Sequence, residues 1–146
     1  MVKKLSKINK KMIIGSSGFP RIIKYVYQKL NLNKYMEEFI DINKINNGKP
    51  NLEIFLQAAN ALNTNPKNCI VVEDSENGIK AAKNAGMKCV AYNGRNSNFQ
   101  NLELADFIIN KYNDENFKKI FNNINLNIEI PKSISNLSIL VFKLFE

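Results

Sequence analysis

The apolar residues of this chain alternate between short continuous runs and longer stretches in which they recur every three or four positions. The continuous runs predict β-strands, because a strand covered on both faces has no polar side. The spaced stretches predict helices with one apolar face. The predicted strands are residues 12–14, 39–42, 69–72, 88–92 and 106–109. The predicted helices begin at Pro20, cover 52–62, run from Ser75 to Gly86, and cover 113–124.

Strands that alternate with helices predict βαβ units, and therefore an α/β fold with a Rossmann-like parallel sheet and helices on both faces. In such sheets, ligands bind at the carboxyl ends of the strands. Polar candidates stand at those ends: Ser16 follows the first strand, and Glu73 and Asp74 follow the strand at 69–72. Lys49 lies in a loop that opens a helix. We therefore expect the functional groups to line one rim of the sheet.

Length and composition favour a single globular domain. The chain has 146 residues, of which 45% are hydrophobic and 23% charged, enough for one core. It contains no histidine, which excludes Ser-His-Asp and Cys-His nucleophile systems and imidazole metal sites. Cys69 and Cys89 lack metal-site spacing, so we expect buried free thiols.

The net charge of +8 is compatible with nucleic-acid binding. All but two of the 21 basic residues are lysines, which are scattered through the chain, and the two arginines are Arg21 and Arg95. Arginine is the preferred residue for bidentate phosphate and base contacts. We therefore rank nucleic-acid binding below the functions considered next.

No stretch of the sequence has the length of a secretion signal or a membrane span. After the lysine-rich start, only residues 12–14 are apolar before Gly15, and the apolar run 134–145 is interrupted by Asn136 and Lys143. A signal peptide needs about 7 to 15 apolar residues and a membrane helix about 20. The sequence therefore predicts a cytoplasmic protein without membrane association.

Three motifs are candidates for chemistry, and each has an ordinary structural alternative. The Gly-Ser-Ser-Gly loop at 15–18 offers hydroxyls and backbone N–H groups to an anion such as phosphate, or simply caps a helix. Lys49 either places its charge on a phosphate oxygen or is an exposed surface lysine. The adjacent carboxylates of Glu73 and Asp74 suit Mg²⁺, whereas Asp74 or Ser75 could instead cap the following helix.

Taken in order, the three motifs resemble the haloacid dehalogenase-like hydrolases, in particular the β-phosphoglucomutase and sugar-phosphate phosphatase branch. The resemblance rests on residues 13–17, 48–62 and 71–87, and it runs from about residue 5 to residue 124. Its most specific part is the Glu-Asp-Ser segment at 73–75. The resemblance implies a Mg²⁺-dependent phosphohydrolase or phosphomutase that acts on a phosphorylated small molecule of the sugar-phosphate type.

The resemblance also implies a role for each candidate residue. Ser16 would bind the phosphoryl group through its hydroxyl, with help from the backbone N–H of Ser17. Lys49 would neutralise the phosphoryl oxygens and the nucleophile, so Ser16 and Lys49 would be the catalytic residues of this chain. Asp74 with Glu73 would hold Mg²⁺. Stabilisation of charge in this way is what phosphoryl transfer requires.

The chain departs from the family in the Asp-x-Asp motif that ends the family's first strand and supplies the nucleophile and the general acid/base. The four aspartates, at 41, 74, 106 and 114, form no such pair. That central strand and the substrate-selecting cap domain are absent from these 146 residues. Without a nucleophile, the remaining groups can bind phosphate but cannot form a covalent intermediate. We therefore expect a truncated or split enzyme that is inactive alone, or alternatively a non-catalytic module that binds a phosphorylated ligand or completes a partner.

In the family, the missing strand lies between the strand before Ser16 and the strand before Glu73. Its loss would leave two apolar edges, so either those strands pair directly or a separate chain carrying the Asp-x-Asp strand and cap supplies the missing one. We expect a partial core domain over 1–124 and a tail over 125–146. The tail is either frame-altered sequence or an added segment that covers an exposed edge.

Overall fold

The computed structural model describes residues 2–94, 97, 99–123 and 138–141. Its strands are β1 (Met12–Ile14), β2 (Cys69–Glu73), β3 (Lys88–Tyr92), β4 (Phe107–Ile109) and β5 (Ser138–Val141). Its α-helices are α1 (Val2–Lys7), α2 (Pro20–Lys29), α3 (Glu53–Ala61), α4 (Glu76–Asn84) and α5 (Asp114–Asn123). Short 3-10 turns cover Leu32–Lys34, Ile42–Lys44 and Pro66–Asn68.

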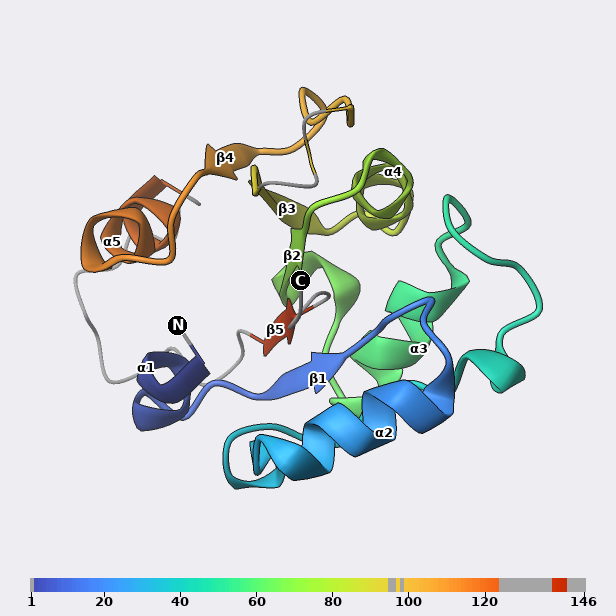
Figure 1. Cartoon of the computed structure of the whole chain (residues 1–146). Coiled ribbons are helices and arrows are strands. Elements are labelled where there is room, and N and C mark those ends of the chain that lie inside the picture. Colours follow the sequence, from blue (N-terminus) through green and yellow to red (C-terminus); the bar gives the residue numbers. More distant parts are fainter. Residues whose placement is uncertain (1, 95–96, 98, 124–137, 142–146) are drawn as a thin grey trace.

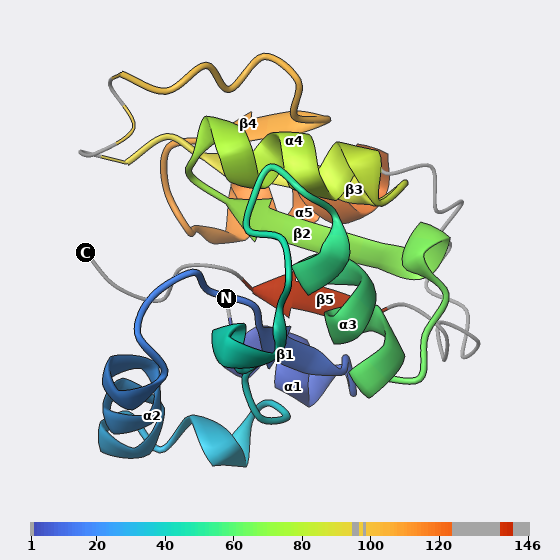
Figure 2. The ribbon, with the colours of Figure 1, turned by 90° about the vertical axis from the view of Figure 1, so that its right-hand side faces the viewer.

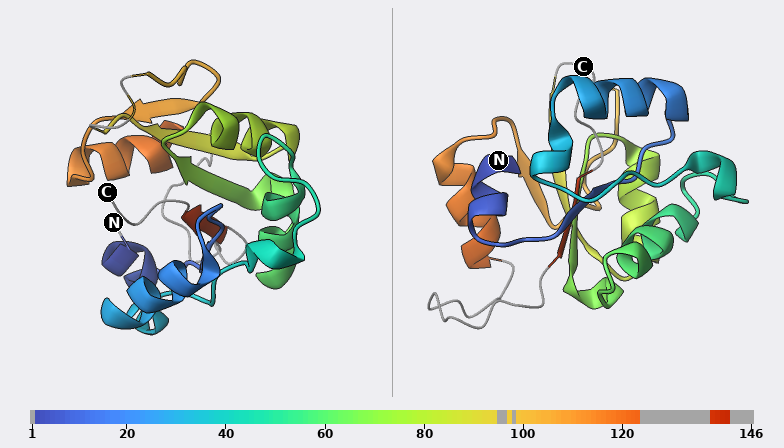
Figure 3. Two further views of the ribbon diagram at one scale, coloured as in Figure 1. Left: turned by 45° about the vertical axis from the view of Figure 1, so that its right-hand side comes forward. Right: turned by 90° about the horizontal axis from the view of Figure 1, so that it is seen from below.

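The five strands form one parallel sheet in the order β1-β5-β2-β3-β4. Helices α3 and α4 cover one face of this sheet, and α1 and α5 cover the other, while α2 lies beside β1 (Figure 1). The two views in Figure 3 show the same layers from other sides. The predicted α/β fold, a parallel sheet with helices on both faces, is confirmed.

Successive residues of β2 feed two cores, one on each face of the sheet. Val71 packs with α3 and α4, where Phe55 is fully buried. Ile70 and Val72 pack on the other side, in the core that Leu5 of α1 enters. Because both faces of β2 are covered, all of its residues before Glu73 are apolar.

Local signals set both ends of α4. The hydroxyl of Ser75 accepts a hydrogen bond from the N–H of Gly78 at 3.1 Å, which is N-cap geometry. Past the other end, Gly86 has a φ of +71°, a backbone conformation that favours glycine. Of the two caps considered from sequence, Ser75 is therefore the one that the structure uses.

The predicted strand at 39–42 is reduced to a single bridge between Phe39 and Ile14. Asp41 ends the extended segment, because its carboxylate accepts the N–H of Asn43 at 3.0 Å and starts a 3-10 turn at Ile42–Lys44. The last predicted helix is present as α5, and its expected final residue, 124, lies outside the described residues.

The sheet between β1 and β2 differs from the predicted direct pairing of these strands. Strands β1 and β2 do not pair with each other, because β5 of the same chain lies between them (Figure 2). Leu140 stands opposite Ile13 of β1 on one side and opposite Val71 of β2 on the other. The prediction that β1 and β2 pair directly is wrong, whereas a strand supplied by a separate chain stays a prediction. Residues 138–141 of the tail form β5, which agrees with the expected alternative of an added segment that covers an exposed edge.

Candidate functional site

The carboxyl ends of β1 and β2 face the same edge of the sheet, because the strands are parallel. Strand β1 leads into the loop at 15–18, and β2 ends at Glu73. Lys49 reaches this edge from the loop before α3. Its Nζ lies 3.5 Å from the carbonyl oxygen of Gly15 and forms an ion pair with Oε1 of Glu73. The structure thus brings Lys49, Glu73 and the start of the 15–18 loop together at one rim.

The ion pair between Lys49 and Glu73 is largely withdrawn from solvent. The Lys49 side chain is 10% exposed and the Glu73 side chain 3%. The ammonium also lies 5.0 Å from the centroid of the Phe55 ring, within cation–π range. Lys49 is therefore not an exposed surface lysine, the alternative interpretation of this residue from the sequence. It is a positive charge fixed at the strand ends by two oxygen acceptors and an aromatic face.

The carboxylate of Glu73 is bound on both oxygens. While Oε1 contacts Lys49, Oε2 accepts the N–H groups of Asp74 and Ser75 and the hydroxyl of Ser75, each at 2.9 Å. The carboxylate also lies against Gly78, where a Cβ would overlap it. Glu73 therefore holds the turn between β2 and α4, a positioning role that the sequence analysis missed. The sequence signal for this role is Gly78, a glycine in the first turn of the helix that follows Glu73.

The serine loop at 15–18 has an internal hydrogen bond. The hydroxyl of Ser16 accepts the N–H of Gly18 at 3.1 Å. Helix α2 begins after Phe19, with no side-chain cap bond and with Pro20 in its first turn. Ser16 is half-buried and Ser17 is exposed. The loop therefore does not serve as a side-chain cap for α2, and it presents Ser17 to solvent at the rim.

Asp74 and Glu73 were the predicted metal ligands, and their chemistry is compatible with Mg²⁺ in part. Asp74 follows β2 directly and is 7% exposed. Among the described residues, no group of three or more His, Cys, Asp or Glu side chains is placed to hold a metal. Mg²⁺ commonly takes only one or two carboxylates and completes its shell with waters and substrate phosphate. Both oxygens of Glu73 already have donors, with Lys49 on Oε1 and the N–H groups of the turn on Oε2.

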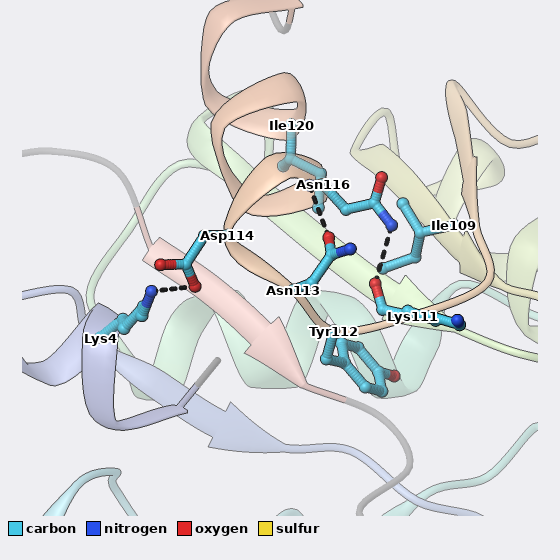
Figure 4. Close-up of a pocket in the computed structure, with 8 residues that line it drawn as sticks. All are labelled: Lys4, Ile109, Lys111, Tyr112, Asn113, Asp114, Asn116 and Ile120. Atoms are coloured by element: carbon cyan, nitrogen blue, oxygen red, sulfur yellow. Dashed lines mark hydrogen bonds and ion pairs between the residues drawn. The ribbon is translucent and has the colours of Figure 1, made fainter.

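A separate pocket lies between α1 and the segment that joins β4 to α5 (Figure 4). Its polar groups bond mainly to one another. Lys4 forms an ion pair with Asp114, and Asn116 donates from its backbone N–H to Asn113 at 2.9 Å and from Nδ2 to the carbonyl of Lys111 at 2.8 Å. The pocket contains none of the predicted site residues, and we assign these contacts to packing of α5.

The two cysteines are free and buried, as predicted. Burial raises the pKa of the Cys69 thiol to about 11. Burial, and next the nearby Glu73 carboxylate, raises the pKa of the Cys89 thiol to about 12. Since only a thiolate is a good nucleophile or metal ligand, neither cysteine belongs to the site.

Solved structures of known proteins share this fold. A β-phosphoglucomutase from Clostridium difficile superposes with a TM-score of 0.71 and 30% identity, over 84% of this chain and 53% of that chain. A putative β-phosphoglucomutase from Thermotoga maritima superposes with a TM-score of 0.67 and 25% identity, over 87% and 57%.

Curated proteins match over shorter stretches. The β-phosphoglucomutase of Bacillus subtilis is 34% identical over 82 residues, which are 56% of this chain and 36% of that protein. A phosphorylated carbohydrates phosphatase of Thermotoga maritima is 39% identical over 61 residues, 42% of this chain and 28% of that protein. The matches therefore cover well under half of these curated relatives.

A family model described as haloacid dehalogenase-like hydrolase matches residues 1–86, more than half of the chain. That region contains Ser16, Lys49, Glu73 and Asp74, together with the strands and helices that position them. This chain belongs to the haloacid dehalogenase-like hydrolase family.

Proposed function

We propose that this chain is the phosphate-binding part of a phosphohydrolase or phosphomutase core, and that its ligand is a phosphorylated small molecule of the sugar-phosphate type. The observation that carries the proposal is the Lys49 ammonium, held at the carboxyl rim of the sheet between the Gly15 carbonyl and the Glu73 carboxylate. A fixed positive charge in a poorly solvated position attracts an anion more strongly than an exposed lysine does. Relatives named as β-phosphoglucomutase and phosphorylated carbohydrates phosphatase support the ligand class.

Each rim residue has a proposed task. The Ser16 hydroxyl and the Ser17 N–H bind phosphoryl oxygens, and Lys49 neutralises their charge. Asp74, with Glu73 beside it, holds Mg²⁺, which when bound supplies further positive charge to the phosphoryl group. Glu73 also orients Lys49, because one oxygen of its carboxylate pairs with the ammonium while the other is fixed by the turn before α4.

We propose further that the chain alone binds phosphate without turning it over. The 146 residues contain no Asp-x-Asp, the motif that the family resemblance assigns to the nucleophile and the general acid/base. The alternative, a non-catalytic module, follows from the same absence. In that case the chain would bind a phosphorylated ligand, or complete a separate chain that carries the Asp-x-Asp strand and cap.

Calorimetric titration of the whole chain with glucose 6-phosphate and with inorganic phosphate, with and without Mg²⁺, tests the binding site. We expect Lys49→Ala to weaken phosphate binding at least tenfold, whereas Lys44→Ala, which removes an exposed lysine nearby, should leave it unchanged. Equal binding by wild type and Lys49→Ala would refute the site. Asp74→Asn should remove the Mg²⁺ dependence of binding and leave some phosphate affinity.

Hydrolysis of p-nitrophenyl phosphate tests the second part of the proposal. We expect no Mg²⁺-dependent turnover by the chain alone. Turnover that is lost in Asp74→Asn would show an active enzyme with the proposed metal ligand, and turnover that survives this substitution would remove that metal role.

Two further expectations accompany the proposal. No helix in the part of the chain that the structure describes is long and apolar enough to cross a bilayer, and the cytoplasmic location stays a prediction.

Nucleic-acid binding is checked by titration with single- and double-stranded oligonucleotides. A binder that uses several lysines should lose affinity steeply as salt rises, and we expect no such binding.

A further inference from the structure

Strand β5 lies inside the sheet, between β1 and β2, although it comes last among the described strands of the chain. It has four residues and parallel partners on both sides. Ile139 stands opposite Met12 of β1 and Ile70 of β2, and Val141 stands opposite Ile14 and Val72. Among the described strands, β5 is the one that joins β1 to β2 in the sheet.

The two strands that flank β5 are buried on both faces. The exposed fractions of their residues opposite β5 are at most 4%, and these residues contribute to both cores of the molecule. They are Met12, Ile13 and Ile14 in β1 and Cys69, Ile70, Val71 and Val72 in β2. Without a strand between them, β1 and β2 would each leave a row of backbone N–H and C=O groups unpaired beside apolar cores. The gap therefore demands an occupant.

We propose that the gap between β1 and β2 is a strand-acceptor site and that β5 is its occupant within the same chain. The site takes a short apolar strand in the parallel direction and pairs its backbone on both edges. A strand offered by any other polypeptide has to displace β5 before it can enter. The proposal rests on the order of the strands, so its tests are independent of the phosphate site.

A disulfide between two cysteines tests directly, in the full chain, whether β5 lies in the gap between β1 and β2. Ser138 is the register partner of Cys69, and neighbouring strands lie about 4.8 Å apart, within the Cα separation of a disulfide. When the unfolded chain is refolded in the presence of copper phenanthroline, so that the oxidant reaches the thiols before they are buried, Ser138→Cys should form a disulfide within one chain, seen as a monomer that is 2 Da lighter. Ser6→Cys, placed in α1, is the matched control and should form no such bond.

Two results of this experiment would overturn the proposal as stated. A disulfide that links two chains would show that β5 of one copy fills the site of another. Absence of any disulfide in the folded Ser138→Cys chain would show that β5 does not lie beside β2. Hydrogen exchange of the unmodified chain gives a second reading, because the β5 amides should be protected to within about tenfold of the β2 amides. Exchange of β5 at the rate of an unstructured peptide would contradict the proposal.

Competition tests whether β5 blocks the site. The probe is a labelled peptide with the sequence of residues 136–146, added to the full chain and to a chain that ends at residue 135. We expect the shortened chain to bind the peptide at least tenfold more tightly. Equal affinity for the two chains, or a folded shortened chain that does not bind, would overturn the proposal. If the shortened chain does not fold alone, the peptide should restore its circular dichroism during refolding, and failure to do so counts against the acceptor site.

Discussion

Gly78 lies so close to Glu73 that a Cβ at position 78 would overlap the carbon and both oxygens of the Glu73 carboxylate. The carboxylate uses this space to reach the backbone N–H groups of Asp74 and Ser75 while its other oxygen faces Lys49. Because Gly78 has no side chain, the Glu73 carboxylate can take the position from which it contacts Lys49. Gly78 is required here by close approach and not by its backbone angles.

Gly78→Ala should displace the Glu73 carboxylate and weaken both the turn and the ion pair with Lys49. The turn must shift to admit a methyl group in a tightly packed place, and we expect a loss of about 1–3 kcal/mol in the free energy of unfolding. Phosphate affinity should fall as well, because Lys49 loses its fixed position. Urea denaturation and calorimetric phosphate titration measure the two effects.

Gly48→Ala is the control for stability, since a Cβ at Gly48 would meet nothing within 4 Å. We expect its unfolding midpoint to stay close to that of the wild type. A Gly78→Ala protein with wild-type stability and wild-type phosphate affinity would contradict the role that we give to the close packing of Gly78 and Glu73.

Ser75→Ala removes two hydrogen bonds with one hydroxyl. The Ser75 oxygen accepts the N–H of Gly78 at 3.1 Å, and the hydroxyl donates to Oε2 of Glu73 at 2.9 Å. Loss of an N-cap costs about 1 kcal/mol, and we expect about 1–2 kcal/mol here because the donor to Glu73 is lost too. Ser75→Thr, which keeps a hydroxyl, should recover most of the stability in the same denaturation experiment. Equal destabilisation by both substitutions would argue against the cap.

The elements that depend on local pattern are those that the sequence predicts well. The apolar run at 69–72 predicts a strand, and Ser75 and Gly86 predict the two ends of a helix, each from residues that are close in the sequence. The structure contains this strand and this helix. The segment at 39–42 has a similar apolar pattern, but the Asp41 carboxylate bonds to its own backbone two residues on and ends the extended conformation. A local hydrogen bond of this kind competes with strand pairing.

The contacts that depend on distant parts of the chain are those that the sequence left open. Nothing in the composition of residues 134–145 indicates that residues 138–141 lie between β1 and β2, because that place is set by pairing with these two strands. Likewise, the rule that carboxylates after a strand bind cations suggests Mg²⁺ for Glu73, but the cation that contacts it is Lys49, from 24 positions earlier in the chain. The sequence therefore predicts which residues lie at the rim of the sheet, but it does not predict which of them contact one another.

The buried thiols predict a loss of stability in alkaline solution. The ordinary pKa of a cysteine thiol is 9.0, and burial raises the pKa of Cys89 to about 12 in the folded chain. The folded state therefore keeps its proton where the unfolded state loses it. The stability due to Cys89 is complete below about pH 9 and falls as pH rises from there toward 12, by up to about 1.4 kcal/mol per pH unit.

Comparison with Cys89→Ala isolates this effect. Between pH 8 and pH 10, the advantage of the wild type over the variant in urea denaturation should shrink by about 1 kcal/mol. In native protein at pH 8, both thiols should also react with a disulfide reagent only after denaturant is added. Rapid reaction without denaturant, or parallel pH profiles for the two proteins, would contradict burial of Cys89.

Asp106 should stabilise the fold until strongly acidic conditions. Burial opposes ionisation of its carboxyl, but hydrogen bonds from the Lys83 ammonium and from the Cys89 N–H outweigh it, so that the pKa of Asp106 lies below its ordinary 3.8. The stabilisation is therefore complete above about pH 4 and is lost as pH falls through the lowered folded-state value. Asp106→Asn should cost about 1–3 kcal/mol at pH 7, as expected for hydrogen bonds to a charged group. The difference between the denaturation curves of the two proteins should shrink as pH falls below about 4, and a difference that stays constant on acidification would point to a cause other than ionisation.

The pairing of Lys49 with Glu73 should appear as a coupling energy between the two residues. Lys49→Met leaves a carboxylate that is 3% exposed without its ammonium, and breaking such a buried pair costs about 3–5 kcal/mol. Glu73→Gln alone should also destabilise, because the ammonium then lacks its counter-charge. The double variant removes both charges, so its loss should be smaller than the sum of the single losses by about 1–3 kcal/mol. Additive losses in urea denaturation would mean that the two side chains do not interact, whereas the expected coupling, together with loss of phosphate affinity in Lys49→Met, would tie the stability of the rim to its capacity for anions.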